Sequence, residues 1–280
     1  MSTSPPSAEA GPSPDASTDG FAARRLRGVG RAALGAYRTN RALVGLALHT
    51  ASAAVRLRFE GREVLRQAFL MGNRSVLFLT VTLAFMGVIS VYQSGLQIQA
   101  VLPDFSTLGP AFLQLLTREF GPTVVGLMVA TRVGSGVAAE LGSMVVTEQI
   151  DALRMCDADP VEYLVVPRTL ASAVMVPLLS VYAVAVAMLA GALAGQSAFD
   201  IAPRAFWDLS LVSYDDLAVG LAKATSYGVA IPVLAAHAGL ATTGGSEGVG
   251  WATTRAVVNT SFAVIALDLV ISSIDYALAS

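Results

Sequence analysis

Charged side chains inside long apolar stretches are the residues of this sequence with the greatest capacity for chemistry. Arg118 and Glu119 open one such stretch, and Arg132 and Glu140 lie within it or near its far end. Asp268 lies in the last apolar stretch. A charge at the bilayer centre costs about 2.5–3.5 kcal/mol on insertion scales, so such groups normally face a partner or a wet cavity. We therefore expect these residues either to pair locally at interfaces or to line a polar route through a membrane.

Most familiar catalytic and metal centres are excluded. Cys156 is the only cysteine, which rules out an internal disulfide and a cysteine-based zinc or iron–sulfur site. His49 and His237 are the only histidines, and their separation excludes an HExxH motif. No GxxxxGK(S/T) phosphate loop is present, so the chain cannot cradle ATP by that route. The sequence therefore predicts no catalytic site, no metal and no bound cofactor.

The composition is that of an integral membrane protein. Apolar residues make up 54% of the 280 residues and charged residues only 14%, whereas soluble domains carry about 25% charged residues. A soluble surface this apolar would associate. Eleven of the 18 basic residues lie within residues 1–74. This asymmetry indicates a membrane surface, and the basic runs with interleaved aromatics that mark a nucleic-acid groove are absent.

Three regions are expected along the chain. Residues 1–20 are rich in Pro and Ser and are predicted to be a disordered tail. Residues 21–74 are basic and amphipathic. Their apolar run, 42–55, would span only about 21 Å as a helix, too short for a ~30 Å hydrocarbon core. We expect a helix lying in the membrane interface, with packing on protein as the open alternative. Residues 75–280 are predicted to form a five-span domain.

Five apolar stretches in that domain reach the length of about 20 residues needed to cross a bilayer as helices. They are residues 75–99, 119–138, 169–194, 216–240 and 256–279. The eleven arginines before the first stretch place the N-terminus in the cytoplasm by the positive-inside rule. The predicted fold class is therefore an all-α integral membrane protein with an N-terminal interfacial amphipathic helix and five transmembrane helices.

A polar amphipathic segment separates the second and third stretches. Within residues 145–154, Val146, Ile150 and Leu153 recur at helical spacing, and polar residues occupy the opposite face. Asp159 is placed to cap the helix that follows. With the N-terminus inside, this short helix is cytoplasmic. It could dock a soluble partner or serve as a plain connector, and the pattern leaves both readings open.

Several short motifs resemble the MlaE/YrbE family of ABC-transporter permeases. They are Arg118-Glu-Phe-Gly-Pro122, Arg132-Val-Gly-Ser135, Ala139-Glu-Leu-Gly142, Val146-Thr-Glu-Gln-Ile-Asp-Ala-Leu153, Asp159-Pro160 and Val166-Pro-Arg168. The stretch from Ala252-Thr-Thr-Arg-Ala-Val-Val258 to Asp268 is similar to the family's final span. The resemblance covers roughly residues 24–280.

The resemblance implies a permease that forms a homodimer and pairs with two cytoplasmic ATPase subunits, which bind ATP and Mg²⁺. It also implies an MCE-domain lipid-binding protein as a partner and, in some members, a STAS-domain subunit. Such complexes move phospholipids or related lipids between the bacterial inner membrane and the outer envelope. ATP hydrolysis belongs to the partner, so the permease itself is expected not to be an enzyme.

The same resemblance assigns roles to individual residues. Those expected near the lipid cavity are Arg118, Glu119, Tyr92, Gln93 and Gln97. Those expected on a coupling helix that meets the ATPase are Glu148, Gln149, Asp151, Leu153 and Arg154. Independently of the resemblance, Arg132, Glu140 and Asp268 are expected to be buried polar residues, because they are charged and lie within or near apolar stretches.

Two other classes compete with a permease. An ion-coupled secondary transporter could use Asp268, Glu140 and Arg132 as an ion path, would need no ATPase, and would ideally show inverted repeats. Five spans do not divide into two equal halves, which weighs against it. A structural membrane anchor for an envelope assembly is the third reading, and the charged residues within the spans argue mildly against that.

Overall fold

The computed structural model describes Tyr37, Thr39, residues 41–56 and 61–101, Phe105 and residues 107–279. The predicted tail 1–20 and most of the basic segment before residue 41 lie outside these residues. The chain divides into two compact units, residues 1–45 and 46–280. All regular elements of the described residues are helical, which confirms the all-α prediction for this part of the chain.

In the part of the chain that the structure describes, five helices are long and apolar enough to cross a membrane, as the sequence predicts. They are Gly61–Ala100, Leu108–Val146, Val161–Phe199, Tyr214–Leu240 and Gly245–Leu278. A shorter apolar helix, Arg41–Val55, precedes them. Its place in the membrane interface, and the boundary at residue 74, remain predictions.

The long helices are built from the following elements. They are α2 (Gly61–Val101), α3 (Leu108–Leu115), η1 (Leu116–Phe120), α4 (Gly121–Val129), η2 (Ala130–Gly134), α5 (Ser135–Val146), η3 (Val161–Val165), α7 (Val166–Phe199), α8 (Tyr214–Leu240) and α9 (Gly245–Ala279). A short helix, α6 (Gln149–Met155), follows α5, and a single 3-10 turn, η4 (Pro203–Trp207), precedes α8.

Helices extend further than the apolar stretches that predicted them. α2 begins at Gly61 instead of residue 75, and the second helix begins at Leu108 instead of residue 119. Pro110 does not prevent that early start, because it occupies the first turn of α3, where backbone N–H groups have no intrahelical partner. A hydropathy window finds the part of a helix suited to hydrocarbon and leaves out its polar ends.

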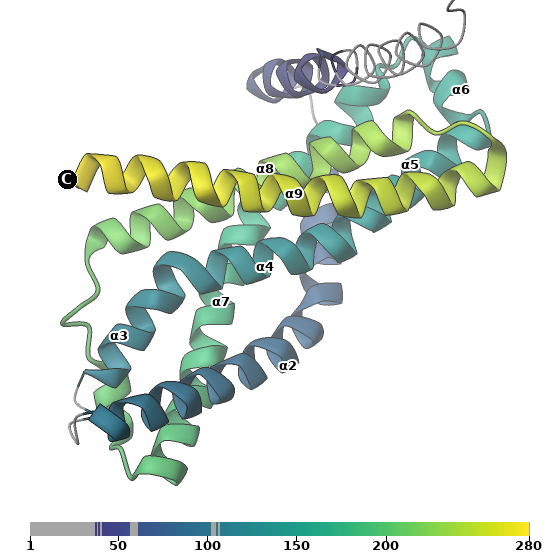
Figure 1. Ribbon diagram of the computed structural model, residues 1–280. Helices are drawn as coiled ribbons and strands as arrows, with labels where there is room; N and C mark the ends of the chain where they lie inside the picture. The colour runs from purple at the N-terminus through teal and green to yellow at the C-terminus, as the bar shows by residue number, and fades with distance from the viewer. Residues whose placement is uncertain are drawn as a thin grey trace, which may run out of the picture. The chain divides into compact units, whose positions relative to one another are not determined.

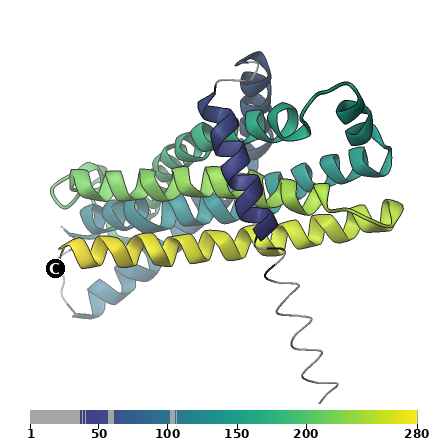
Figure 2. The ribbon, with the colours of Figure 1, turned by 90° about the horizontal axis from the view of Figure 1, so that it is seen from above.

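Neighbouring helices pack closely along their lengths. α7 packs against both α2 and α8, while α9 runs beside α8 and α5 (Figures 1 and 2). At Gly87 a β-carbon would lie 2.3 Å from the carbonyl oxygen of Ala187, so only glycine permits the observed approach of α2 to α7. Close backbone contact at small residues is the usual way in which membrane helices gain packing energy.

The second long helix contains two π-helical segments, η1 and η2. Each holds one of the arginines singled out from the sequence, Arg118 in η1 and Arg132 in η2. A π-segment adds a residue to one turn and so changes the direction in which the following side chains point, and such segments often mark functional sites. The sequence carried no signal for either segment.

The amphipathic segment predicted at residues 145–154 is not one helix. α5 ends at Val146, Glu148 adopts a left-handed conformation with φ of 59°, and α6 begins at Gln149. Val146 therefore does not share a helix face with Ile150, contrary to the prediction, because the turn between the helices breaks the periodicity. In Figure 1, α6 lies at the end of the helices where α5 ends and α9 begins.

Candidate functional site

The most extensive polar cluster of the described residues connects η1 with α8 and α9. Arg118 donates hydrogen bonds to Asp216 at 3.0 Å and to Asp275. Its neighbour Glu119 accepts a bond from Lys223. Arg118 and Glu119 thus do not pair with each other; each binds a partner far away in the sequence. We call this set of residues, together with those added in the next paragraph, the charge network.

Lys223 is the centre of the network. Its side chain has no exposed surface, and its Nζ atom lies 3.0 Å from a carboxylate oxygen of Asp268. The same carboxylate accepts hydrogen bonds from the Tyr227 hydroxyl at 2.8 Å and from Thr123 at 3.2 Å. A buried ammonium group is tolerated only when opposite charges and hydrogen bonds replace its lost hydration. Glu119 and Asp268 supply that replacement.

Helical spacing on α8 and α9 brings the members of the network together. Asp216, Lys223 and Tyr227 lie on one face of α8, because their separations of seven and four residues correspond to about two turns and one turn. Asp268 and Asp275 lie on one face of α9 for the same reason, since they are seven residues apart. Both faces meet the helix that contains η1.

Gly220 makes the contact between α8 and η1 possible. A β-carbon at this position would lie 2.2 Å from the carbonyl oxygen of Thr117, the residue before Arg118. Gly220 sits between Asp216 and Lys223 on the same face of α8. Its lack of a side chain therefore allows both charged residues to reach Arg118 and Glu119.

Sequence reasoning missed most partners in the network. Asp216, Lys223 and Tyr227 were not singled out. A signal did exist, because Lys223 is the only lysine in the chain and interrupts an apolar helix. What the sequence could not supply was its partners, which lie on other helices.

Arg132 and Glu140 were expected to be buried, and in the described chain both are exposed. Each faces a pocket between α2 and α5, not the core. Glu140 pairs at 2.7 Å with Arg168 of α7, which is almost completely buried. Asp268 is partly buried and belongs to the charge network, and no ion pair or hydrogen bond in the described residues joins it to Arg132 or Glu140.

Tyr92, Gln93 and Gln97 lie on the last part of α2, and all three are exposed. The Tyr92 ring packs near Phe199 of α7, with 5.8 Å between ring centroids. Within the described residues no hydrogen bond or ion pair joins these three side chains to the charge network. Their expected place near a lipid cavity stays a prediction.

α6 presents an exposed polar surface. Glu148, Gln149, Asp151 and Arg154 are exposed, Leu153 is partly buried, and Ile150 is buried. Asp151 and Arg154 form an ion pair at 3.1 Å across one turn. Downstream, the Asp159 carboxylate accepts a bond from the Val161 amide at 2.8 Å, so Asp159 caps the next helix, as the sequence predicts.

One group of side chains has the composition of a metal site. Ligand atoms of His49, Asp159 and Glu162 lie within 4.8 Å of one another. The His49 imidazole lies 3.1 Å from Asp159, and both side chains are more than a third exposed. A surface ion pair that connects the helix Arg41–Val55 to the start of η3 accounts for the His49–Asp159 contact.

Comparison with known proteins identifies the chain. Residues 64–274 match the family described as Permease MlaE. The chain belongs to the MlaE permease family. It is 35% identical over 217 residues to a probable ABC transporter permease protein of Synechocystis, covering 77% of this chain and 82% of that protein. It is 34% identical over 219 residues to the intermembrane phospholipid transport system permease protein MlaE of Haemophilus influenzae, covering 76% and 82%.

A plant relative matches over a shorter stretch of the chain. The chloroplastic protein TRIGALACTOSYLDIACYLGLYCEROL 1 of Arabidopsis thaliana is 36% identical over 169 residues, which is 60% of this chain and 48% of that protein. Together these relatives confirm the family predicted from the motifs. An MlaE permease is a multi-pass membrane subunit of an ABC transporter, in which ATP is hydrolysed by partner subunits and not by the permease.

Proposed function

We propose that this MlaE permease is the transmembrane subunit of an ATP-driven transporter that moves phospholipids or related lipids between the inner membrane and the outer envelope of a bacterium. It works as a homodimer with two cytoplasmic ATPase subunits and an MCE-domain lipid-binding protein, and a STAS-domain subunit can join the complex. Its N-terminus lies in the cytoplasm, as the basic first quarter of the chain indicates.

One structural observation supports a mechanism in which movement of the ATPase is coupled to the charge network. α6 is joined by the two-residue turn Thr147–Glu148 to the same long helix that holds Arg118 and Glu119 near its other end. Arg118 lies 28 residues from Val146, about 42 Å along a helix. A displacement of α6 by a closing ATPase dimer would therefore move the charge network directly, through one continuous element.

The π-segments η1 and η2 divide this element at two points. They interrupt the regular hydrogen bonding of the helix at Arg118 and at Arg132. The regular helix between them can move as a rigid rod. A π-segment can convert to α-helical geometry, which shifts the register of the residues that follow it. In the proposed cycle, movement of α6 alters η1 and with it the position of the Arg118 guanidinium.

Arg118 is the proposed guide for the lipid phosphate. Its side chain is 35% exposed, so its guanidinium can be reached although two carboxylates already bind it. Guanidinium and phosphate form charge-assisted, often bidentate hydrogen bonds. The exposed Tyr92, Gln93 and Gln97 are proposed to line the cavity that accepts the remainder of the lipid.

Affinity purification of the tagged full chain in mild detergent tests this function, with mass spectrometry of the proteins and lipids that accompany it. We expect an ATPase with ABC motifs, an MCE-domain protein and bound phospholipid. Recovery of the folded chain without an ATPase would overturn the proposal and favour an autonomous carrier or a membrane anchor. Arg118→Gln should reduce the bound lipid while leaving the protein complex intact.

A further inference from the structure

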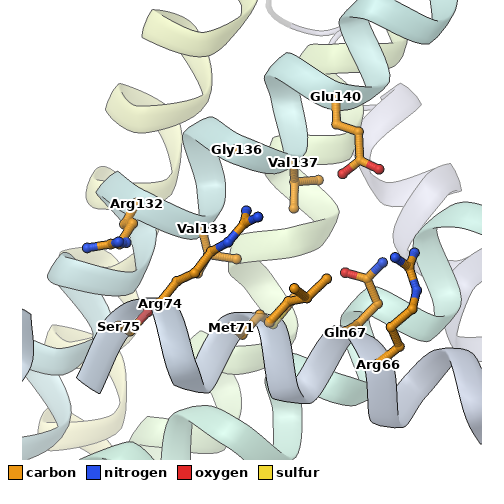
Figure 3. A pocket seen from close by; sticks show the side chains of 11 residues that line it. Arg66, Gln67, Met71, Arg74, Ser75, Arg132, Val133, Gly136, Val137 and Glu140 are labelled. Carbon is orange, nitrogen blue, oxygen red and sulfur yellow. The ribbon is translucent and has the colours of Figure 1, made fainter. Parts of the chain in front are cut away.

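A pocket of about 140 Å³ opens between α2 and the helix formed by η2 and α5, away from the charge network. It lies at the level of Arg132, which is 14 residues from Arg118 and therefore about 21 Å further along the helix. Figure 3 shows Arg74 and Arg132 at one end of the pocket and Arg66, Gln67 and Glu140 at the other. Met71, Val133 and Val137 supply apolar surface between the two ends.

The charges around this pocket are only partly compensated. Arg66 forms a two-bond ion pair with Glu63, at 2.7 and 2.8 Å. Glu140 is compensated by the buried Arg168. Arg74 and Arg132 then remain, and neither guanidinium group has an ion pair or a hydrogen bond with any residue that the structure describes. The pocket thus carries two uncompensated guanidinium groups, which favours an anion.

A second observation independently points to a ligand. Ser75 is 3% exposed and lines the pocket beside Arg74, and its Oγ atom is buried without a hydrogen-bond partner. The large majority of buried side-chain polar atoms in proteins are hydrogen-bonded, so an exception calls for an explanation. A ligand oxygen in the pocket would accept the missing bond from this hydroxyl.

The pocket is open at α5 and lies next to the polar end of an apolar helix. At Gly136 a β-carbon would meet no atom within 4 Å, so the wall of α5 is open there. No charged residue follows Arg74 until Asp104, so Arg74 marks the polar end of the apolar part of α2. Arginines at such a boundary lie at the depth of lipid phosphates, and basic pockets between membrane helices bind anionic headgroups.

We propose that this pocket binds a phosphate group, of the kind carried by an anionic phospholipid, at a site separate from the charge network. The guanidinium groups of Arg74 and Arg132 and the hydroxyl of Ser75 donate hydrogen bonds to the phosphate oxygens. Val133 and Val137 contact the first part of the acyl chains. The site does not require ATP-driven transport, and so it goes beyond the function proposed above.

Lipid binding to the purified, delipidated full chain tests this site by native mass spectrometry. The probes are phosphatidic acid, the diacylglycerol with the same acyl chains, and inorganic phosphate. Arg74→Gln combined with Arg132→Gln should weaken binding of phosphatidic acid by about tenfold or more, since both charge-assisted contacts to the phosphate are lost. Arg62→Gln is the matched control, because Arg62 is an exposed arginine of α2 that does not line the pocket.

Ser75→Ala provides a second test of the site with a variant that is not expected to destabilise the fold. Removal of an unpartnered buried hydroxyl should leave the melting temperature of the lipid-free chain unchanged or slightly raised, and yet weaken binding of phosphatidic acid severalfold. If the native chain binds inorganic phosphate and the same variants lose that binding, the phosphate site is supported. The result would also show that phosphate binds there without a lipid attached. Equal binding of diacylglycerol and phosphatidic acid, or equal losses in Arg62→Gln and the double variant, would overturn the proposal.

Discussion

The ammonium group of Lys223 lies 3.0 Å from the carboxylate of Asp268, and the Lys223 side chain has no exposed surface. This pair joins α8 to α9, and through Glu119 the same ammonium group also joins both to η1. Two consecutive helices, α8 and α9, and the distant segment η1 are thus connected at one buried positive charge. The pair is therefore part of what holds the helices together as well as part of the candidate site.

Replacement of Lys223 by Met should destabilise the permease strongly. Glu119 and Asp268 would lose their shared cation, and removal of one partner from a buried ion pair costs about 3–5 kcal/mol. Thermal unfolding in detergent, followed by fluorescence-detected size exclusion, measures the effect. A triple variant that adds Glu119→Gln and Asp268→Asn should recover most of the loss, because no unpaired charge remains. An unchanged melting temperature for Lys223→Met alone would show that the network does not stabilise the fold.

The sequence predicted the helices well and their contacts poorly. Five helices could be recognised because each must satisfy its own backbone groups in hydrocarbon, which leaves a long apolar stretch as a signature. Arg118 and Glu119 could be recognised as unusual for the same reason. Their partners Asp216 and Lys223 lie about 100 residues away, at 98 and 104 positions, and no one-dimensional pattern states which helices adjoin. The π-segments and the turn at Glu148 likewise depend on the packing of neighbouring helices.

Gly220→Ala should disrupt the charge network without changing any charge. The added methyl group would lie 2.2 Å from the Thr117 carbonyl oxygen, so α8 must move away from η1. We expect a net loss of about 1–3 kcal/mol from overpacking, although alanine favours a helix by about 1 kcal/mol over glycine. Gly136→Ala is the control, since its methyl group would meet no atom within 4 Å. Equal melting temperatures for the two variants would contradict the close contact at Gly220.

Asp275→Asn should raise the amount of phospholipid that accompanies the purified permease, while Arg118→Gln should lower it. Asp275 and Asp216 both form ion pairs with the Arg118 guanidinium, and their carboxylates compete with a lipid phosphate for the same N–H groups. Removing the Asp275 charge weakens one competitor, whereas Asp216 retains its bonds to Arg118 and to the start of α8. Lipid phosphorus per mole of protein is the measurement. A fall in both variants would show that Asp275 only supports the fold.

Labelling of Cys156 tests which side of the membrane α6 occupies. This residue is the only cysteine of the chain and is exposed directly after α6. A membrane-impermeant maleimide should react with it in inside-out vesicles and not in intact right-side-out vesicles. Addition of detergent to the unreactive preparation is the control, because it must restore labelling. Labelling in right-side-out vesicles would place α6 outside and remove its proposed contact with a cytoplasmic ATPase.

Asp151→Lys should separate the ATPase from the permease without unfolding either protein. Asp151 is exposed, and its contact in the described chain is the ion pair with Arg154 of the same helix. Exposed pairs of this type contribute at most about 1 kcal/mol, so the melting temperature of the permease should hardly change. A reversed charge at the centre of a docking surface costs far more binding free energy, since like charges across an interface repel.

Co-purification of the ATPase with Asp151→Lys is the measurement. Asp215→Lys serves as the matched control, because Asp215 is also exposed but lies in the first turn of α8. Equal recovery of the ATPase with both variants would show that α6 does not form the contact.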